Sequence, residues 1–449
     1  MSDDITRRKF LMATGIVGFC GLTGFTGYHV FLKNPLRPYK KPKDPKAEKA
    51  KVVVIGGGAG GAIAAKYIRM AAPEIEVTLI EQNKEYYTCF MSNEVLSGER
   101  TIDSLKFSYE KLSSQYGINM VYDRALGIDP EAKTVTLQGG DKVNYDRLIV
   151  SPGIDFKWGT IEGHDENVIE KIPHAWKAGP QTVTLRQQIE AMKDGGTVII
   201  SVPPKPFRCP PGPYERASQI AHYLKQHKPK SKVLIFDGNQ AFSKKPLFFQ
   251  GWEQLYGFET DHSLIEWIPP EDGGKIIQVN PNDMSIIAGE FEDEYKADVI
   301  NIIPPQTAGK IAIVSGLAND KGWCPINPET FESTLQKDIH VIGDACIGKP
   351  MPKSAHSANS QAKVCAAAVV SGLQEQEMPT PYYGNTCYSV VGEDFGISVT
   401  AIYQLVDNKI QLVEGAGGPS PLNASAEVRK REVIYAESWF KNITHEMFN

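Results

Sequence analysis

The chain has 449 residues and a formal net charge of −5, and 41% of its residues are hydrophobic and 22% charged. This length predicts two or three domains, and the composition is that of a folded globular protein, which excludes a disordered or fibrous chain. Residues 1–46 carry nine Lys/Arg and three Asp, a charge of +6, which leaves −11 for the remainder. So acidic a body is poorly suited to neutralising phosphates, and we exclude nucleic acid as a partner.

The N-terminus has the features of an export signal. Arg7 and Arg8 precede an apolar, glycine-rich stretch over residues 11–32, as in signals of the twin-arginine route. That route moves folded proteins, so we expect a cofactor inserted before export and a periplasmic protein. The alternative is a short membrane anchor with a chance arginine pair, and we expect membrane contact only if this segment stays uncleaved. Residues 1–47 are predicted to be signal and linker.

The folded body is predicted to begin with a dinucleotide-binding unit. Residues 51–55 (KVVVI) form a continuous apolar run typical of a buried strand, and the pattern G-x-G-x-x-G follows it and opens a helix over residues 62–70. In this pattern Gly56 makes a tight turn, Gly58 admits a pyrophosphate close to the backbone, and Gly61 allows close helix packing. A second strand ends at Glu81, whose carboxylate is placed to bind ribose hydroxyls.

Two later segments favour FAD over NAD as the ligand of this unit. Residues 145–153 (YDRLIVSPG) resemble the strand-and-glycine crossover of FAD-linked disulfide reductases, and residues 340–345 (HVIGDA) resemble their late strand, whose aspartate binds the flavin ribityl chain. The resemblance assigns that role to Asp344. It also implies an FAD domain that is discontinuous in sequence.

A second nucleotide-binding fold is predicted without its ligand. Residues 196–202 form another strand and residues 217–225 another helix, but the turn between them is rich in proline instead of glycine. Proline has no backbone N–H to donate and cannot adopt positive φ, so this turn is not built to hold a pyrophosphate. We therefore expect no NAD(P) here.

Six cysteines lie in the folded body, and six cysteines allow fifteen pairings. None forms a C-x-x-C pair or a C-x-x-C-H haem motif, and we predict no metal site. Cys209 follows Arg208 and precedes a helix, and both features are expected to lower its thiol pKa. On these grounds Cys209 is a candidate nucleophile, with a structural disulfide as the alternative.

Four segments make a more specific resemblance, to the flavoprotein subunit of flavocytochrome c sulfide dehydrogenase. It extends over the body from residue 51 to residue 449 and implies a thioether from Cys89 to FAD and a redox-active disulfide between Cys209 and Cys387. For the second cysteine of the disulfide, Cys324 and Cys346 remain rivals. The segments that carry the resemblance are residues 86–89 (YYTC), 207–217 (FRCPPGPYERA), 350–354 (PMPKS) and 385–389 (NTCYS).

The resemblance implies an α/β fold with two Rossmann-like dinucleotide-binding domains of the disulfide reductase type and a C-terminal α+β domain. It also implies an enzyme that oxidises sulfide and passes electrons to a c-type cytochrome subunit. Alternatives are a sulfide:quinone oxidoreductase and a non-catalytic sulfur carrier that retains the fold. The predicted boundaries are residues 48–161 plus 302–374 for the FAD domain, 162–301 for the second Rossmann-like domain and 375–449 for the C-terminal interface domain.

Overall fold

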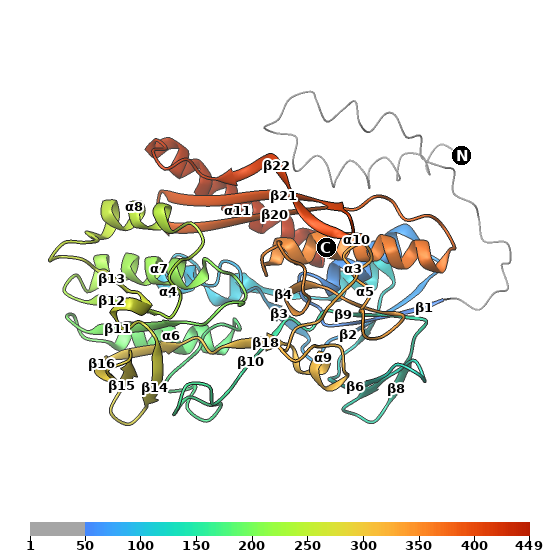
Figure 1. Ribbon diagram of the computed structural model, residues 1–449, viewed down its shortest axis with the longest axis horizontal. Helices are drawn as coiled ribbons and strands as arrows, with labels where there is room; N and C mark the ends of the chain where they lie inside the picture. Colours follow the sequence, from blue (N-terminus) through green and yellow to red (C-terminus); the bar gives the residue numbers. More distant parts are fainter. Residues whose placement is uncertain (1–49) are drawn as a thin grey trace. The chain divides into compact units, whose positions relative to one another are not determined.

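The computed structural model describes residues 50–449, so the predicted signal and linker at residues 1–47 lie outside the described residues. Three main sheets organise this part of the chain (Figure 1). The predicted α/β fold with two dinucleotide-type units and a C-terminal α+β unit is confirmed. Within residues 50–449, no helix combines the length and apolarity needed to cross a membrane.

The first sheet has five parallel strands in the order β19-β9-β1-β2-β5. Helices α3 and α10 pack against each other beside it, and both carry buried alanines, such as Ala65 and Ala362, which allow the close approach of the two helices. The elements of this unit are β1 (Lys51–Ile55), α3 (Gly61–Ala71), β2 (Glu76–Ile80), β3 (Glu85–Tyr87), α4 (Glu94–Ser97), β4 (Lys106–Ser108), α5 (Glu110–Tyr116), β5 (Asn119–Val121), β6 (Ala125–Asp129), β7 (Thr134–Leu137), β8 (Lys142–Asn144), β9 (Arg147–Val150), β10 (Ile154–Phe156), β18 (Gln306–Ala308), α9 (Lys310–Val314), β19 (Ile339–Val341) and α10 (Ala355–Leu373).

The second sheet has four parallel strands in the order β13-β12-β11-β17. Strand β11 is buried along almost its whole length, as its apolar sequence requires of a central parallel strand. The elements of this unit are α6 (Pro180–Ala191), β11 (Thr197–Val202), α7 (Gly212–His227), β12 (Lys232–Asp237), α8 (Lys245–Tyr256), β13 (Ile265–Ile268), β14 (Ile276–Asn280), β15 (Ser285–Ala288), β16 (Asp293–Lys296) and β17 (Val299–Ile302).

The third sheet is antiparallel and consists of β20 (Tyr382–Gly392), β21 (Phe395–Val406) and β22 (Lys409–Pro419). Helix α11 (Ala426–Phe448) packs on it, and Figure 1 shows this layer lying over both parallel-sheet units. Trp439 and Phe440 of α11 contact Phe90 with ring centroids 5.3 and 5.9 Å apart, so this helix packs its aromatic side chains against the first unit.

One helix boundary was predicted wrongly. The second unit's helix was expected over residues 217–225, but α7 begins at Gly212 and ends at His227. Pro213 occupies the first turn of α7, where a missing backbone N–H costs no intrahelical hydrogen bond. The proline run therefore continues into the helix.

The glycine motif shows why each glycine is required. A Cβ on Gly56, whose φ is +94°, would lie 2.3 Å from the Ser151 carbonyl oxygen. A Cβ on Gly61 would lie 1.9 Å from the Gly56 carbonyl oxygen, whereas one on Gly58 would meet nothing nearer than 3.5 Å. Gly56 and Gly61 thus let the strand, the turn and α3 pack together, and Gly58 leaves room above the turn.

We predict that Gly61→Ala destabilises the protein by about 1–3 kcal/mol, because the new methyl group overlaps a backbone carbonyl that cannot move away. Alanine in an unhindered helix is instead stabilising. The control is Gly372→Ala in α10, where a Cβ meets nothing within 4 Å, and a gain of about 0.5–1 kcal/mol is expected there. Thermal unfolding of the two variants checks the opposite signs.

Candidate functional site

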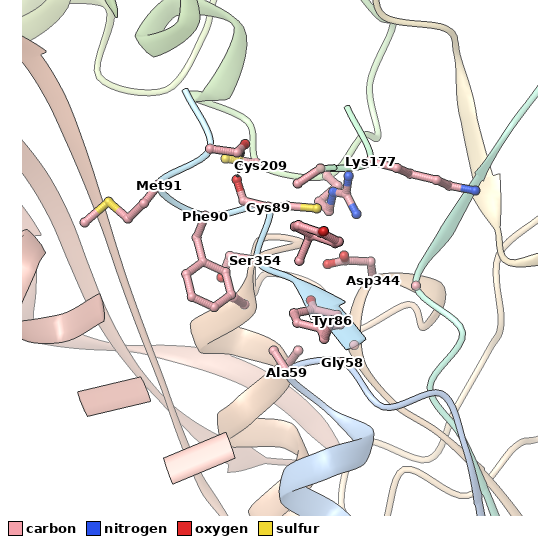
Figure 2. Close-up of a pocket in the computed structure, with 18 of the residues that line it drawn as sticks. Gly58, Ala59, Tyr86, Cys89, Phe90, Met91, Lys177, Cys209, Asp344 and Ser354 are labelled. Carbon is pink, nitrogen blue, oxygen red and sulfur yellow. Dashed lines mark hydrogen bonds between the residues drawn. The ribbon is translucent and has the colours of Figure 1, made fainter. Parts of the chain in front are cut away.

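A cavity of about 1320 Å³ is lined by segments from all three units. Figure 2 shows Gly58 and Tyr86 at one end of this pocket, Cys209 at the other, and Cys89 and Asp344 between them. Gly61, the third glycine of the motif, does not line the cavity. Of the residues predicted from the sequence to form the site, those that line the cavity are Gly56, Gly58, Glu81, Cys89, Cys209, Asp344 and Cys387.

The glycine turn and Glu81 form the first part of the cavity wall. Glu81 follows β2, and its Oε2 atom accepts a hydrogen bond of 2.8 Å from the backbone N–H of Gly57. Its Oε1 atom accepts from the backbone N–H of Asn83 at 2.9 Å. These bonds hold the carboxylate at the mouth of the turn, as a ribose-binding group beside a pyrophosphate loop requires.

Asp344 has an unsatisfied acceptor that faces the cavity. Its Oδ1 atom is shielded from water and has no hydrogen-bond partner among the described residues. Burial raises the pKa of this carboxyl, and Arg208 and Lys353 oppose the shift. An unpaired buried acceptor of this kind is costly unless a ligand hydroxyl donates to it. Together with the glycine turn and Glu81, it fits the ribityl and pyrophosphate groups of FAD.

Arg208 supplies positive charge to the centre of the site. Its guanidinium donates to the Trp176 carbonyl oxygen. Although burial lowers the pKa of Arg208, the neighbouring Cys89 and Asp344 raise it on balance. Cys89 lies two residues beyond β3, and the Ser92 hydroxyl donates to its carbonyl oxygen at 2.6 Å. Cys89 therefore lines the same cavity as the Arg208 guanidinium and the unsatisfied carboxylate oxygen of Asp344.

Cys209 and Cys387 are brought into the same cavity from distant parts of the chain. Cys209 lies in the proline-rich turn with φ of +55°, and its backbone N–H donates to the Lys353 carbonyl oxygen at 2.8 Å. Cys387 lies on β20, and its sulfur is 3.6 Å from the Asn385 amide nitrogen. Cys387 is close enough to Cys209 to raise the pKa of the Cys209 thiol, and both thiols are free in the structure. The site roles of the two cysteines remain predictions.

The expected acidity of Cys209 is wrong. Burial raises the pKa of its thiol, and the negative charges of Glu215 and Cys387 raise it further, while Arg208 and Lys244 only partly compensate. Arg208 favours the thiolate, but the loss of water and the Glu215 carboxylate on the first turn of α7 outweigh it.

The rival cysteines occupy a different place. Cys324 and Cys346 are neighbours in a parallel β-bridge, both are buried, and neither lines the cavity. Burial raises the pKa of Cys346 to about 11 and that of Cys324 to about 12. Cys365 is buried in α10 and also lies outside the lining, as a small apolar residue of the helix core.

Several charged residues of the site received no role from the sequence. Glu215 accepts from the backbone N–H of Val390 at 3.0 Å and from the Asn93 amide at 2.9 Å, and burial raises its pKa. Lys353 donates to the carbonyl oxygens of Asp344 and Cys346 at 2.6 and 2.9 Å. Glu215 lies in the motif at residues 207–217 and Lys353 in the motif at residues 350–354. A charged residue within a proline-rich motif was the feature of the sequence from which a site role could have been predicted.

The proline-rich turn after β11 faces this cavity with Arg208, Cys209 and Pro211. The corresponding turn of the first unit is the glycine motif. The second unit therefore contributes a cysteine where the first contributes an anion-binding turn. Within residues 50–449, no group of three or more His, Cys, Asp or Glu side chains is arranged to hold a metal ion.

Three family models match the chain. Residues 50–184 match pyridine nucleotide-disulphide oxidoreductase, residues 182–304 the central part of the sulfide dehydrogenase [flavocytochrome c] flavoprotein chain, and residues 379–448 the flavin-binding part of flavocytochrome c sulphide dehydrogenase. Together they span most of the described residues.

Individual proteins agree with the models. The sulfide dehydrogenase [flavocytochrome c] flavoprotein chain of Chlorobaculum thiosulfatiphilum is 53% identical over 45 residues, 10% of this chain and 94% of that sequence. The mitochondrial sulfide:quinone oxidoreductase of Mus musculus is 20% identical over 76% of each chain. The solved structure of sulfide:quinone oxidoreductase from Aquifex aeolicus has a TM-score of 0.68 at 19% identity, covers 88% of this chain and 92% of its own, and shows the common fold.

We predict opposite effects of Asp344→Asn on stability and on cofactor affinity, measured in a Cys89→Ala background from which FAD can be removed. Without FAD, the variant should be about 1–2 kcal/mol more stable at pH 7, because it removes a carboxylate that is buried without a partner. With FAD, affinity should fall about 10-fold, because a neutral acceptor makes a weaker hydrogen bond than a charged one.

The pH dependence gives the control for this prediction. The folded-state pKa of Asp344 is raised, so its ionised form costs stability above the pH at which the unfolded aspartate ionises, about 3.9. The stability difference between the two FAD-free proteins should therefore shrink as the pH falls toward that value. A difference that does not change with pH would contradict the assigned cause.

Proposed function

Since this chain belongs to the flavoproteins related to flavocytochrome c sulfide dehydrogenase and sulfide:quinone oxidoreductase, within the disulfide reductase superfamily, we propose that it oxidises sulfide with bound FAD and a Cys209–Cys387 disulfide. The observation that carries the proposal is the position of both cysteines in the cavity that also contains the glycine turn, Glu81 and Asp344. Sulfur chemistry and cofactor binding then share one cavity.

The first step is thiol–disulfide exchange on the protein. Hydrosulfide attacks one sulfur of the oxidised pair, forms a new S–S bond there, and leaves the other cysteine as a thiolate. A second hydrosulfide removes the outer sulfur as a hydrodisulfide anion, so both cysteines are then reduced. FAD, when bound, supplies the two-electron acceptor that allows the dithiol to close again.

The chain's own residues prepare this exchange. Arg208 places a fixed positive charge beside Cys209 and so favours the approach of an anion. Burial raises the pKa of the Glu215 carboxyl, which lies near enough to Cys209 to influence its charge. This carboxyl can hold or release a proton when the Cys209 thiol is oxidised or reduced. Asn93 fixes this carboxyl at 2.9 Å, so its position does not depend on the substrate.

Cys89 is proposed to bind FAD covalently through its sulfur. It lines the cavity, follows the Tyr-Tyr-Thr sequence of the resemblance, and lies beside Arg208 and Asp344. A covalent bond prevents the loss of the cofactor after export. Export by the twin-arginine route to the periplasm belongs to the same proposal, and its support is the arginine pair and apolar stretch at residues 7–32.

A c-type cytochrome is proposed as the electron acceptor. Its support is the match of residues 379–448 to the flavin-binding model of flavocytochrome c sulphide dehydrogenase, which includes β20 and α11. A quinone is the second candidate, favoured by the relatives that are sulfide:quinone oxidoreductases. The two acceptors differ in size and chemistry: one is a folded haem protein and the other a small organic molecule.

We predict that sulfide bleaches the flavin of the anaerobic wild-type protein and that a c-type cytochrome reoxidises it faster than a water-soluble quinone. Cys209→Ser should retain flavin but lose at least about 1,000-fold in the rate of bleaching, because no disulfide remains for exchange. Stopped-flow absorbance measures both rates. Cys365→Ala, outside the cavity, is the control and should bleach normally; normal bleaching of Cys209→Ser would refute the disulfide chemistry.

We also predict that acid precipitation leaves flavin attached to the wild-type polypeptide and releases it from Cys89→Ala. A thioether survives acid unfolding, whereas the hydrogen bonds of the glycine turn do not. Absorbance of the supernatant and mass spectrometry of the peptide containing Cys89 measure the result. Cys209→Ser should keep its flavin on that peptide, and free FAD from the wild type would exclude the covalent link.

A further inference from the structure

Lys244 is a buried lysine behind the cysteine pair. It lies immediately before α8 and has φ of +63°, a left-handed conformation that a lysine rarely adopts. Its side chain is only 8% exposed. The next residue, Lys245, instead lies over the Trp267 ring at 3.8 Å and is partly exposed. Backbone strain and burial at the first of two adjacent lysines indicate a specific role for it.

The Lys244 ammonium group is directed toward β20. It donates to the Cys387 carbonyl oxygen at 3.1 Å and to the Ser389 hydroxyl at 2.8 Å. Within residues 50–449 it makes no salt bridge to a carboxylate. A buried ammonium group with only neutral partners pays a large desolvation cost, so an anionic partner in some state of the protein would offset that cost.

The negative groups near Lys244 narrow the choice of that partner. Its electrostatic neighbours are Cys387, Glu215, Cys209 and Glu432, with Cys387 the strongest. Glu215 is already held by Asn93 and the backbone of β20. Glu432 on α11 is held by the Ser420 and Ser398 hydroxyls, which donate to its carboxylate.

The sulfur atoms remain as the groups that acquire charge during the reaction. Tyr403 on β21 also lies near Cys387, and burial raises its pKa, so it stays neutral. Burial also lowers the pKa of Lys244, and Cys387 opposes that shift more than any other neighbour does. A negative charge on the Cys387 sulfur would therefore be stabilised by Lys244.

We infer that Lys244 is a positioning residue that stabilises negative charge on the Cys387 sulfur when the Cys209–Cys387 bond opens. The inference rests on the proposed function and adds which of the two sulfur atoms hydrosulfide attacks. Hydrosulfide attacks the Cys209 sulfur and forms a Cys209 persulfide, the Cys209–Cys387 bond breaks, and its electron pair leaves on Cys387 as a thiolate. Glu215 beside Cys209 favours the same direction, because a carboxylate makes Cys209 the poorer leaving group.

The test measures the reactivity of Cys387 in the full-length flavoprotein after reduction of its disulfide. Iodoacetamide modification of the peptide containing Cys387 is followed by mass spectrometry as a function of pH, since only the thiolate reacts. In Lys244→Met, the half-maximal rate should move at least about one pH unit upward, a 10-fold slower reaction at neutral pH. Lys244→Arg should restore most of the rate, and Lys245→Met should match the wild type.

Flavin content and circular dichroism of each variant identify any loss of folding. If Lys244→Met misfolds, Lys244→Arg and Lys244→Gln carry the test: the charged variant should retain the Cys387 reactivity and the neutral one should lose it. Equal reactivity in charged and neutral variants would overturn the inference, as would a parallel loss in Lys245→Met.

Anaerobic treatment with one equivalent of sulfide separates this inference from the proposed function. Mass spectrometry should find the additional sulfur on Cys209, and its presence on Cys387 would overturn the direction of attack. If sulfide adds to neither cysteine, the proposed function fails. The alkylation result would still decide whether Lys244 stabilises the Cys387 thiolate.

Discussion

The Arg208 guanidinium lies in a cavity with three groups that are negative in at least one state: Cys89, Asp344 and Cys209. Each comes from a different segment, and each would be unfavourable at this depth without a nearby cation. The contact from Arg208 to the Trp176 carbonyl oxygen anchors this charge to the segment before α6. The proposed cofactor site and the proposed cysteine pair therefore share the positive charge of Arg208.

The two parallel sheets use the same strand–turn–helix unit for different chemistry. In the first, Gly56 and Gly61 allow β1, β9 and α3 to approach within a distance that no side chain tolerates, and the turn is open to a phosphate. In the second, prolines replace the glycines and the turn presents Cys209. The prolines of this turn offer few backbone donors to an anion, and the turn instead places the Cys209 thiol in the cofactor cavity.

The third sheet completes the site from above. Strand β20 contributes Cys387 and contacts α7, so the cysteine from the C-terminal unit meets the cysteine that precedes α7. Lys244 is held by the same strand through Cys387 and Ser389. Strand β20 therefore carries the Cys387 thiol and also binds the buried Lys244 ammonium group. The charge on the Cys387 sulfur is in this way linked to the packing between the second and third sheets.

Much of the cofactor site could be predicted from the sequence because its requirements are local. The glycine spacing, Glu81 at the end of the next strand and Asp344 after a late strand are set by backbone geometry over a few residues. The fold class followed from the same patterns. The start of α7 was misplaced because prolines, which break helices elsewhere, are tolerated in a first turn.

Sequence by itself predicted residues that line the dinucleotide-type cavity, among them Gly56, Glu81 and Asp344, and it predicts that the second turn is unsuited to a phosphate. Only the tertiary structure decided that Cys387 and not Cys324 or Cys346 shares a cavity with Cys209, that the thiol of Cys209 has a raised pKa, and that Lys244 lies behind the pair. The physical reason is that desolvation and charge proximity depend on which distant segments exclude water from a side chain, and no local pattern records those segments.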